Sequence, residues 1–112
     1  MIEIIQGDTI KKARKVHRCQ WCFATIGIGE NYVDSVLKGD EIYHWRSHPR
    51  CNALVEKLDM FARSDYELDG ERFQEIVRNE YREIAIINPL IETFDMKEFR
   101  NRLGVVLTFH GL

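Results

Sequence analysis

The three cysteines of the chain and one of its four histidines follow a spacing that suits a metal ion. Two residues separate Cys19 from Cys22, and after a stretch of 25 residues two more separate His48 from Cys51. Two-residue spacing lets one tight turn or one helical turn direct two ligands at the same ion, and structural zinc sites use four thiolate or imidazole ligands arranged as a tetrahedron. The pattern C-x2-C-x25-H-x2-C therefore predicts one structural Zn2+.

Other uses of these residues stay open at this point. A thioredoxin-like redox pair stands at the start of a helix, whereas Cys22 is followed by FATIGIGE, which is rich in glycine and β-branched residues. His44 is an alternative ligand to His48, although six residues separate it from Cys51, and the three cysteines could also be unconnected. Zinc is favoured because both pairs have finger-like spacing.

A closed set of four protein ligands argues against catalysis. Catalytic zinc keeps one position open for water or substrate, whereas structural zinc does not, so we expect no enzyme. A metal-dependent nuclease on the same scaffold is the less favoured alternative. Such a nuclease would need a further His/Asn/His constellation in the hairpin and helix, and the helix predicted after Cys51 offers Asn52, Glu56 and Lys57 but no histidine.

The elements that must position the ligands are read from periodicity and turn residues. A short strand is expected over 2–5, then a turn, and a second strand or extended arm over 10–18. Two antiparallel strands over 31–37 and 42–45 are joined by a KGDE turn. Apolar residues at helical spacing predict a helix over about 49–63, with proline in its first turn. The first cysteine pair would lie on a knuckle between strands, and the second ligand pair at the start of this helix.

Helical periodicity continues in the second half of the chain. A helix is predicted over about 70–87, with Asp69 as its N-cap, and the Asn-Pro pair at 88–89 ends it. Its apolar stripe comprises Phe73, Ile76, Val77, Tyr81 and Ile84.

A short helix and a strand complete the predicted elements. Asp95 and Glu98 have the spacing of a capping box, and Gly104 is expected to close the helix. A last strand is expected over 105–109, pairing with the N-terminal strand. The apolar residues of the short helix are Met96, Phe99 and Leu103.

The predicted fold class is α+β. Residues 1–64 are expected to form a treble-clef-like zinc module, and residues 65–112 a helical extension packed on it as one compact domain. A chain of 112 residues can bury only a modest core, so a bound metal would help to hold the fold.

Two segments carry a resemblance to a known family. HRCQWCFATIGIGENYV (17–33) and HWRSHPRCNAL (44–54) are similar to the zinc finger of poly(ADP-ribose) polymerases. The insertion between the ligand pairs is a few residues shorter than in that finger, and the His-Trp-x-His element is one residue longer. The residues that match in kind are Cys19, Cys22, Ile26, Gly29, Trp45, His48 and Cys51.

The resemblance covers about residues 11–55 and implies a treble-clef fold. LIM modules and small zinc-finger proteins of phages share the same skeleton, and the size of the chain suggests a phage or prophage accessory protein. In the polymerases the finger binds DNA ends, so the resemblance implies a DNA-binding role by analogy.

The two halves of the chain differ in net charge. Residues 1–52 hold eight Lys/Arg and six Asp/Glu, net +2, whereas residues 53–112 hold eight and twelve, net −4. Five of the eight basic residues of the first half fall within 11–18. This basic segment is either a solvated face or part of a nucleic-acid surface. The candidate nucleic-acid contacts are Lys11, Lys12, Arg14, Lys15, Arg18, Trp21, Arg46 and Arg50.

A protein partner is the alternative to a nucleic acid. The sequence pI of about 6.1 is low for a dedicated DNA binder, and in this alternative the acidic helices after residue 64 would form the docking surface of an adaptor. No small-molecule substrate is expected. The apolar runs are too short for a bilayer and the N-terminus lacks the pattern of a secretory signal, so a cytoplasmic location without membrane attachment is expected.

Overall fold

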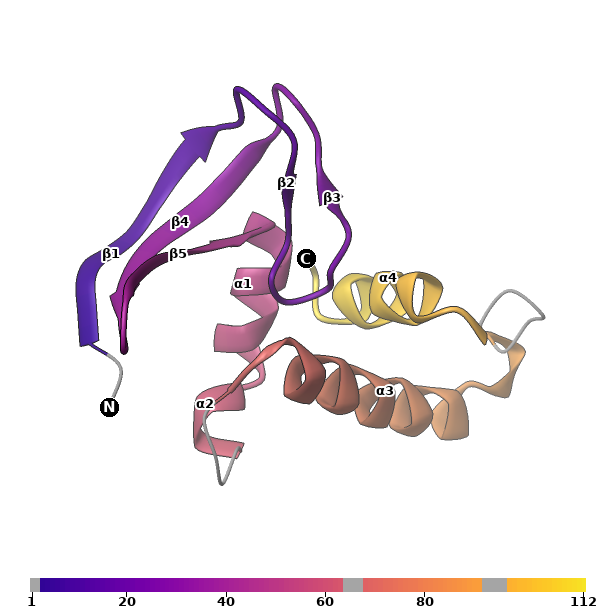
Figure 1. Ribbon diagram of the computed structural model, residues 1–112. Helices are drawn as coiled ribbons and strands as arrows, with labels where there is room; N and C mark the ends of the chain where they lie inside the picture. Colours follow the sequence, from indigo (N-terminus) through magenta and orange to yellow (C-terminus); the bar gives the residue numbers. More distant parts are fainter. Residues whose placement is uncertain (1–2, 64–67, 92–96) are drawn as a thin grey trace. The chain divides into compact units, whose positions relative to one another are not determined.

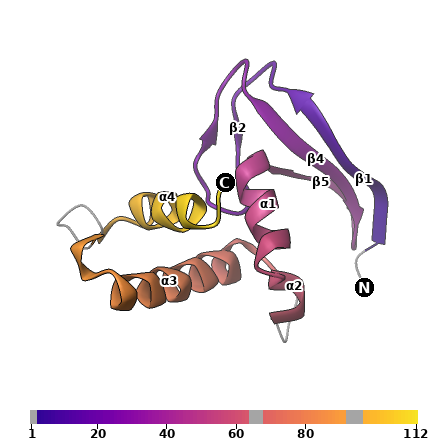
Figure 2. The same cartoon turned by 180° about the vertical axis from the view of Figure 1, so that it is seen from behind.

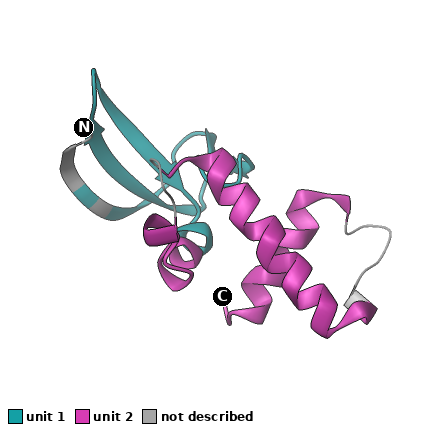
Figure 3. Cartoon of the chain, turned by 90° about the horizontal axis from the view of Figure 1, so that it is seen from below, with its two compact units in different colours: residues 1–52 teal, residues 53–112 magenta. Residues whose placement is uncertain are grey.

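The computed structural model describes residues 3–63, 68–91 and 97–112, and it confirms the predicted α+β class (Figure 1). The chain forms two compact units, residues 1–52 and residues 53–112 (Figure 3). The elements in chain order are β1 (Glu3–Lys12), β2 (His17–Arg18), β3 (Thr25–Ile26), β4 (Asn31–Lys38), β5 (Ile42–Ser47), α1 (Pro49–Lys57), α2 (Met60–Arg63), α3 (Gly70–Ile87), the 3-10 helix η1 (Pro89–Ile91) and α4 (Phe99–Phe109).

The first unit contains two small antiparallel sheets. One has the strand order β1-β4-β5 and the other pairs β2 with β3 (Figure 1). The predicted hairpin is present, because Lys38 pairs with Ile42 across the turn. The predicted division of the N-terminal segment is wrong, since β1 runs through the expected turn at residues 6–9 and ends at Lys12. The pairing register of β1 with β4 shifts on either side of Gln6. The expected turn is therefore an irregularity of the bulge type, and the strand continues through it.

A buried carboxylate ties the three strands of the larger sheet together. Asp34 on the central strand β4 is 3% exposed, and it accepts hydrogen bonds from Lys11 Nζ on β1 and His44 Nδ1 on β5, both at 2.9 Å. Burial opposes ionisation of Asp34, but the hydrogen bonds from Lys11 and His44 outweigh it and hold the pKa of the carboxyl below its ordinary value. The Asp34 carboxylate therefore links β4 to both of its neighbouring strands.

Replacing Asp34 with asparagine tests this link. A depressed pKa means that the ionised carboxylate stabilises the fold at neutral pH, and that this contribution is lost as the pH falls below about 4 through the folded-state value. We expect Asp34→Asn to lower the free energy of unfolding by about 1–2 kcal/mol at pH 7 and to differ less from the wild type at pH 3. Urea unfolding at both pH values measures this. The matched control is Asp40→Asn in the exposed turn before β5, and an equal loss at both pH values would contradict the ion-pair account.

The helix after the last cysteine is shorter than predicted. α1 begins at Pro49 and ends at Lys57, and α2 begins only at Met60, so the continuous helix expected over 49–63 is wrong. Asp59 has a φ of +50°, a left-handed conformation that interrupts the helix and that aspartate tolerates better than most residues. The apolar spacing that predicted one helix continues across this break.

The second unit is built around a helix that the sequence predicted well. α3 spans Gly70–Ile87, and the side chain of Asp69 accepts a hydrogen bond from the N–H of Arg72 at 2.9 Å, which confirms the predicted N-cap. α4 lies beside it in two opposite views (Figures 1 and 2). The five residues of the predicted apolar stripe are buried: Phe73, Ile76, Val77, Tyr81 and Ile84.

The C-terminal segment is a helix and not the predicted strand. α4 runs from Phe99 through Gly104 to Phe109, so the expected helix end at Gly104 and the strand over 105–109 are both wrong. Leu103, Val106 and Leu107 are buried at helical spacing, and this packing overrides the β propensity of the segment VVLTF. Asp95, part of the predicted capping box, and Met96 lie outside the described residues; Glu98 is the N-cap without a side-chain hydrogen bond. No helix in the described ranges is long and apolar enough to cross a membrane.

Two glycines give a matched pair of predictions. A Cβ added at Gly104 or at Gly29 would meet no atom within 4 Å, but Gly29 has a φ of +88° whereas Gly104 lies in a helix interior. Gly104→Ala should therefore stabilise the protein by about 0.5–1 kcal/mol, and Gly29→Ala should destabilise it by about 1–2 kcal/mol. Thermal unfolding of both variants checks the signs. A destabilised Gly104→Ala variant would contradict the helical assignment.

Candidate metal centre

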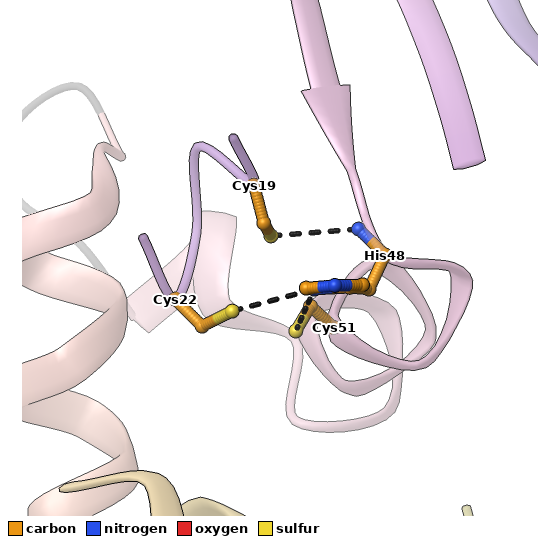
Figure 4. Close-up of side chains that lie close together, drawn as sticks. All are labelled: Cys19, Cys22, His48 and Cys51. Carbon is orange, nitrogen blue, oxygen red and sulfur yellow. Dashed lines mark hydrogen bonds between the residues drawn. The ribbon is translucent and has the colours of Figure 1, made fainter. Parts of the chain in front are cut away.

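The four predicted ligands come together within the first unit (Figure 4). Cys19 and Cys22 lie in the turn that joins β2 to β3, His48 follows β5 directly, and Cys51 lies in the first turn of α1. The turn is closed by a hydrogen bond from the Cys19 N–H to the Ala24 carbonyl and one from the Phe23 N–H to the Cys19 carbonyl, both 2.8 Å. Each predicted pair thus occupies a local element that directs two side chains to one point.

The distances in the cluster match one tetrahedral ion. One ligand atom from each of the four side chains can be chosen so that all lie within 4.8 Å of one another. Ligands at typical zinc–sulfur and zinc–nitrogen bond lengths, set at a tetrahedral angle, are separated by about 3.6 Å. The Nδ1 atom of His48 lies 3.4 Å from the Cys22 Sγ and 3.9 Å from the Cys51 Sγ. These separations leave room for a single metal ion between the four atoms.

The surroundings orient the imidazole. His48 Nε2 lies 3.2 Å from the carbonyl oxygen of Thr25 on β3, so the Nε2–H donates to the backbone and Nδ1 faces the sulfur atoms. A ligating histidine commonly donates its second N–H in this way, which fixes both tautomer and ring orientation. The backbone N–H of His48 donates to the Cys19 Sγ at 3.4 Å. Cys19 and Cys51 are buried, whereas Cys22 and His48 are half-buried.

The four groups compete for protons when no metal binds them. Hydrogen bonds from Cys22 and then Cys51 lower the pKa of the Cys19 thiol, whereas hydrogen bonds to Cys19 and then Cys22 raise the pKa of the Cys51 thiol. The Cys19 and Cys22 sulfur atoms also raise the pKa of His48 to about 10. The cluster therefore favours thiolate at Cys19 and keeps protons on His48 and Cys51, which a metal ion must displace when it binds.

A residue outside the predicted ligand set holds the cysteine turn on β5. The Gln20 N–H donates to the Arg46 carbonyl, and the Arg46 N–H donates to Gln20 Oε1, both at 2.8 Å. Trp21 packs on Trp45 with ring centroids 4.8 Å apart. Sequence reasoning missed Gln20, because a glutamine between two cysteines carries no local signal of a contact with a strand 26 residues away.

Loss of the Gln20 side chain should weaken metal binding. Gln20→Ala removes the acceptor of the Arg46 N–H and loosens the turn that presents Cys19 and Cys22. We expect a loss of roughly 10-fold in metal affinity, the lower end of the effect of outer-shell contacts, measured by competition with a chromophoric chelator. Gln74→Ala on α3 is the matched control and should leave the affinity unchanged. Equal affinities of Gln20→Ala and the wild type would show that the turn is rigid without this contact.

The predicted nucleic-acid residues are not equivalent in the structure. The prediction that Trp21 offers a stacking surface is wrong, since its ring is 4% exposed and lies against Trp45. Arg18 donates from Nε to the Phe23 carbonyl at 3.0 Å, with its guanidinium 5.3 Å from the ring centroid of that residue. Lys11 is paired with Asp34. The remaining candidates are the exposed Lys12, Arg14, Lys15 and Arg50, and the half-buried Arg46.

Two histidines outside the cluster are also placed. His44, the alternative metal ligand, lies against Asp34 and is not part of the cluster. Burial, followed by the positive charges of Arg46 and Lys15, lowers the pKa of His17. Lys15, between β1 and β2, and Arg46 on β5 therefore both act on the same imidazole.

Comparisons with models of protein families, with curated proteins and with solved structures each gave no match to this chain.

Proposed function

We propose that residues 1–52 form a treble-clef module organised by one structural Zn2+. The donor set supports zinc, because three thiolates and one imidazole in a tetrahedral arrangement are typical of structural zinc sites. The order of elements supports the treble clef: a cysteine turn between β2 and β3, the β4-β5 hairpin, and a helix that carries the last ligand. Cys19, Cys22, His48 and Cys51 would hold the ion.

A zinc ion at this place would stabilise the fold and would not supply a reactive centre. All four tetrahedral positions would be taken by protein atoms, which leaves none for water or substrate. Zinc binding supplies on the order of 10 kcal/mol of folding free energy in small zinc-finger peptides at neutral pH. We therefore propose a non-enzymatic binding module whose first unit depends on metal.

Metal content is the first test. Mass spectrometry of protein purified without a metal-chelating column should find one zinc per chain, and none in a Cys22→Ser, Cys51→Ser double variant. Circular dichroism of the variant should show loss of folded structure, and a chelator should have the same effect on the wild type. A well-folded wild type that contains no metal would refute the structural zinc.

The partner that we propose is a nucleic acid. Support comes from the exposed basic residues of segment 11–18, from Arg50 beside the cluster, and from the net charge of +2 on residues 1–52. The resemblance to the polymerase finger points the same way. A protein partner for the acidic second unit, net −4, is the second candidate.

A salt titration tests the nucleic-acid proposal. Fluorescence anisotropy with a labelled 20-base-pair duplex at several salt concentrations should give an affinity that falls steeply as salt rises, because binding to phosphates releases counterions. An Arg14→Gln, Lys15→Gln variant should bind more weakly than an Arg78→Gln, Arg82→Gln control on the exposed side of α3. Absence of binding by the wild type at 50 mM salt would favour the protein-partner alternative.

A further inference from the structure

One face of the β1-β4-β5 sheet gathers polar and charged side chains. Residues directly opposite each other in antiparallel strands share a face, as do residues two apart in one strand. Lys11 is opposite Tyr32, and Asp34 is opposite Arg46. This face, which we call the polar face, therefore carries Lys11, Tyr32, Asp34, His44 and Arg46.

Lys11 is held on the polar face with donors to spare. Its Nζ lies 2.9 Å from the buried Asp34 Oδ2, and its side chain is 42% exposed. An ammonium group has three donors, and Asp34 accepts from it through one oxygen. The carboxylate thus fixes the position of the cation, and the remaining donors face solvent or a ligand.

Arg46 brings a second cation to the same place. Its Nε is buried and has no acceptor among the residues that the structure describes. Because this atom is buried, a phosphate would have to contact the outer part of the half-buried Arg46 side chain. The positive charge of Arg46 acts on Lys11, where it opposes the rise in pKa that the hydrogen bond to Asp34 causes. Arg46 on β5 is directly opposite Asp34, and Lys11 Nζ on β1 lies 2.9 Å from the carboxylate of that residue, so the two cations flank the same side chain.

We propose that the polar face binds the phosphate backbone of a nucleic acid between Lys11 and Arg46. This inference rests on the proposed nucleic-acid function and assigns the contact to one side of the sheet. Asp34 does not oppose it, because the carboxylate is buried and accepts hydrogen bonds from both Lys11 and His44. Tyr32 is 8% exposed and offers no ring for stacking, so the contact reads phosphates and not bases.

Two arginines of α3 supply a control with the same loss of charge. Arg78 and Arg82 are exposed and are not among the candidate nucleic-acid contacts. Lys11→Gln, Arg46→Gln and Arg78→Gln, Arg82→Gln each remove two positive charges. Only the first variant removes cations from the polar face.

The experiment compares a Lys11→Gln, Arg46→Gln double variant with an Arg78→Gln, Arg82→Gln double variant, using anisotropy with the 20-base-pair duplex across salt concentrations. Loss of two phosphate contacts should reduce the slope of log affinity against log salt by about 2 and the affinity by on the order of 50-fold at 0.1 M salt. Arg78→Gln, Arg82→Gln should change the slope and the affinity by no more than a small fraction of these amounts. Zinc content and circular dichroism verify folding, and Arg46→Gln alone replaces the double variant if that variant is unfolded.

The outcomes separate this inference from the function on which it rests. Binding by the wild type with equal losses in the two variants would overturn the assignment to the polar face and leave nucleic-acid binding intact. Competition by polyglutamate as effective as that by unlabelled duplex would also overturn it, since the face would then accept any polyanion. No binding by the wild type at 50 mM salt would refute both proposals.

Discussion

The candidate metal centre requires side chains from two segments, 25 residues apart, to place their ligand atoms close together. In the structure these four atoms lie within 4.8 Å of one another. The strands of the first unit are arranged to allow this. The β2-β3 turn presents Cys19 and Cys22, and β5 ends at Ser47 so that His48 and the first turn of α1 follow at once. Hydrogen bonds between Gln20 and Arg46 join the turn to β5 beside the ligands. A metal ion held by the four side chains would add its own bonds to these contacts.

The larger sheet depends on a second polar constraint. A buried carboxylate in a small sheet is unfavourable unless hydrogen bonds satisfy it. Asp34 meets this condition with one partner on each neighbouring strand, Lys11 on β1 and His44 on β5. Both partners lie on the same face of the sheet as Asp34. The register of β1 against β4 and the position of Lys11 are therefore parts of a single arrangement. An interaction that holds the strands together also decides where the positive charge lies.

The sequence predicted the parts of this structure that are set by local spacing. The ligand pairs each fall within one turn, and α3 has both a strong 3.6-residue period and an N-cap at Asp69, so both were predictable. The errors arise where distant contacts decide. Val106 and Leu107 look like strand residues but are buried at helical spacing in α4, and Trp21 looks like a stacking residue until Trp45 is placed beside it. The partners of Gln20 and Asp34 lie on other strands, beyond the reach of any local pattern.

The position of the β4-β5 hairpin between the ligand pairs has a consequence for the order of folding. Hairpins form within about 1–10 μs because their contacts are local in sequence. Once Val33 has paired with Ser47, the path from Cys22 to His48 crosses the ladder and no longer follows the whole chain, which makes the loop between the ligand pairs about half as long. Each halving of a flexible loop lowers its closure cost by about 0.6 kcal/mol. A metal ion that arrives after the hairpin has formed therefore meets ligands that are already partly brought together.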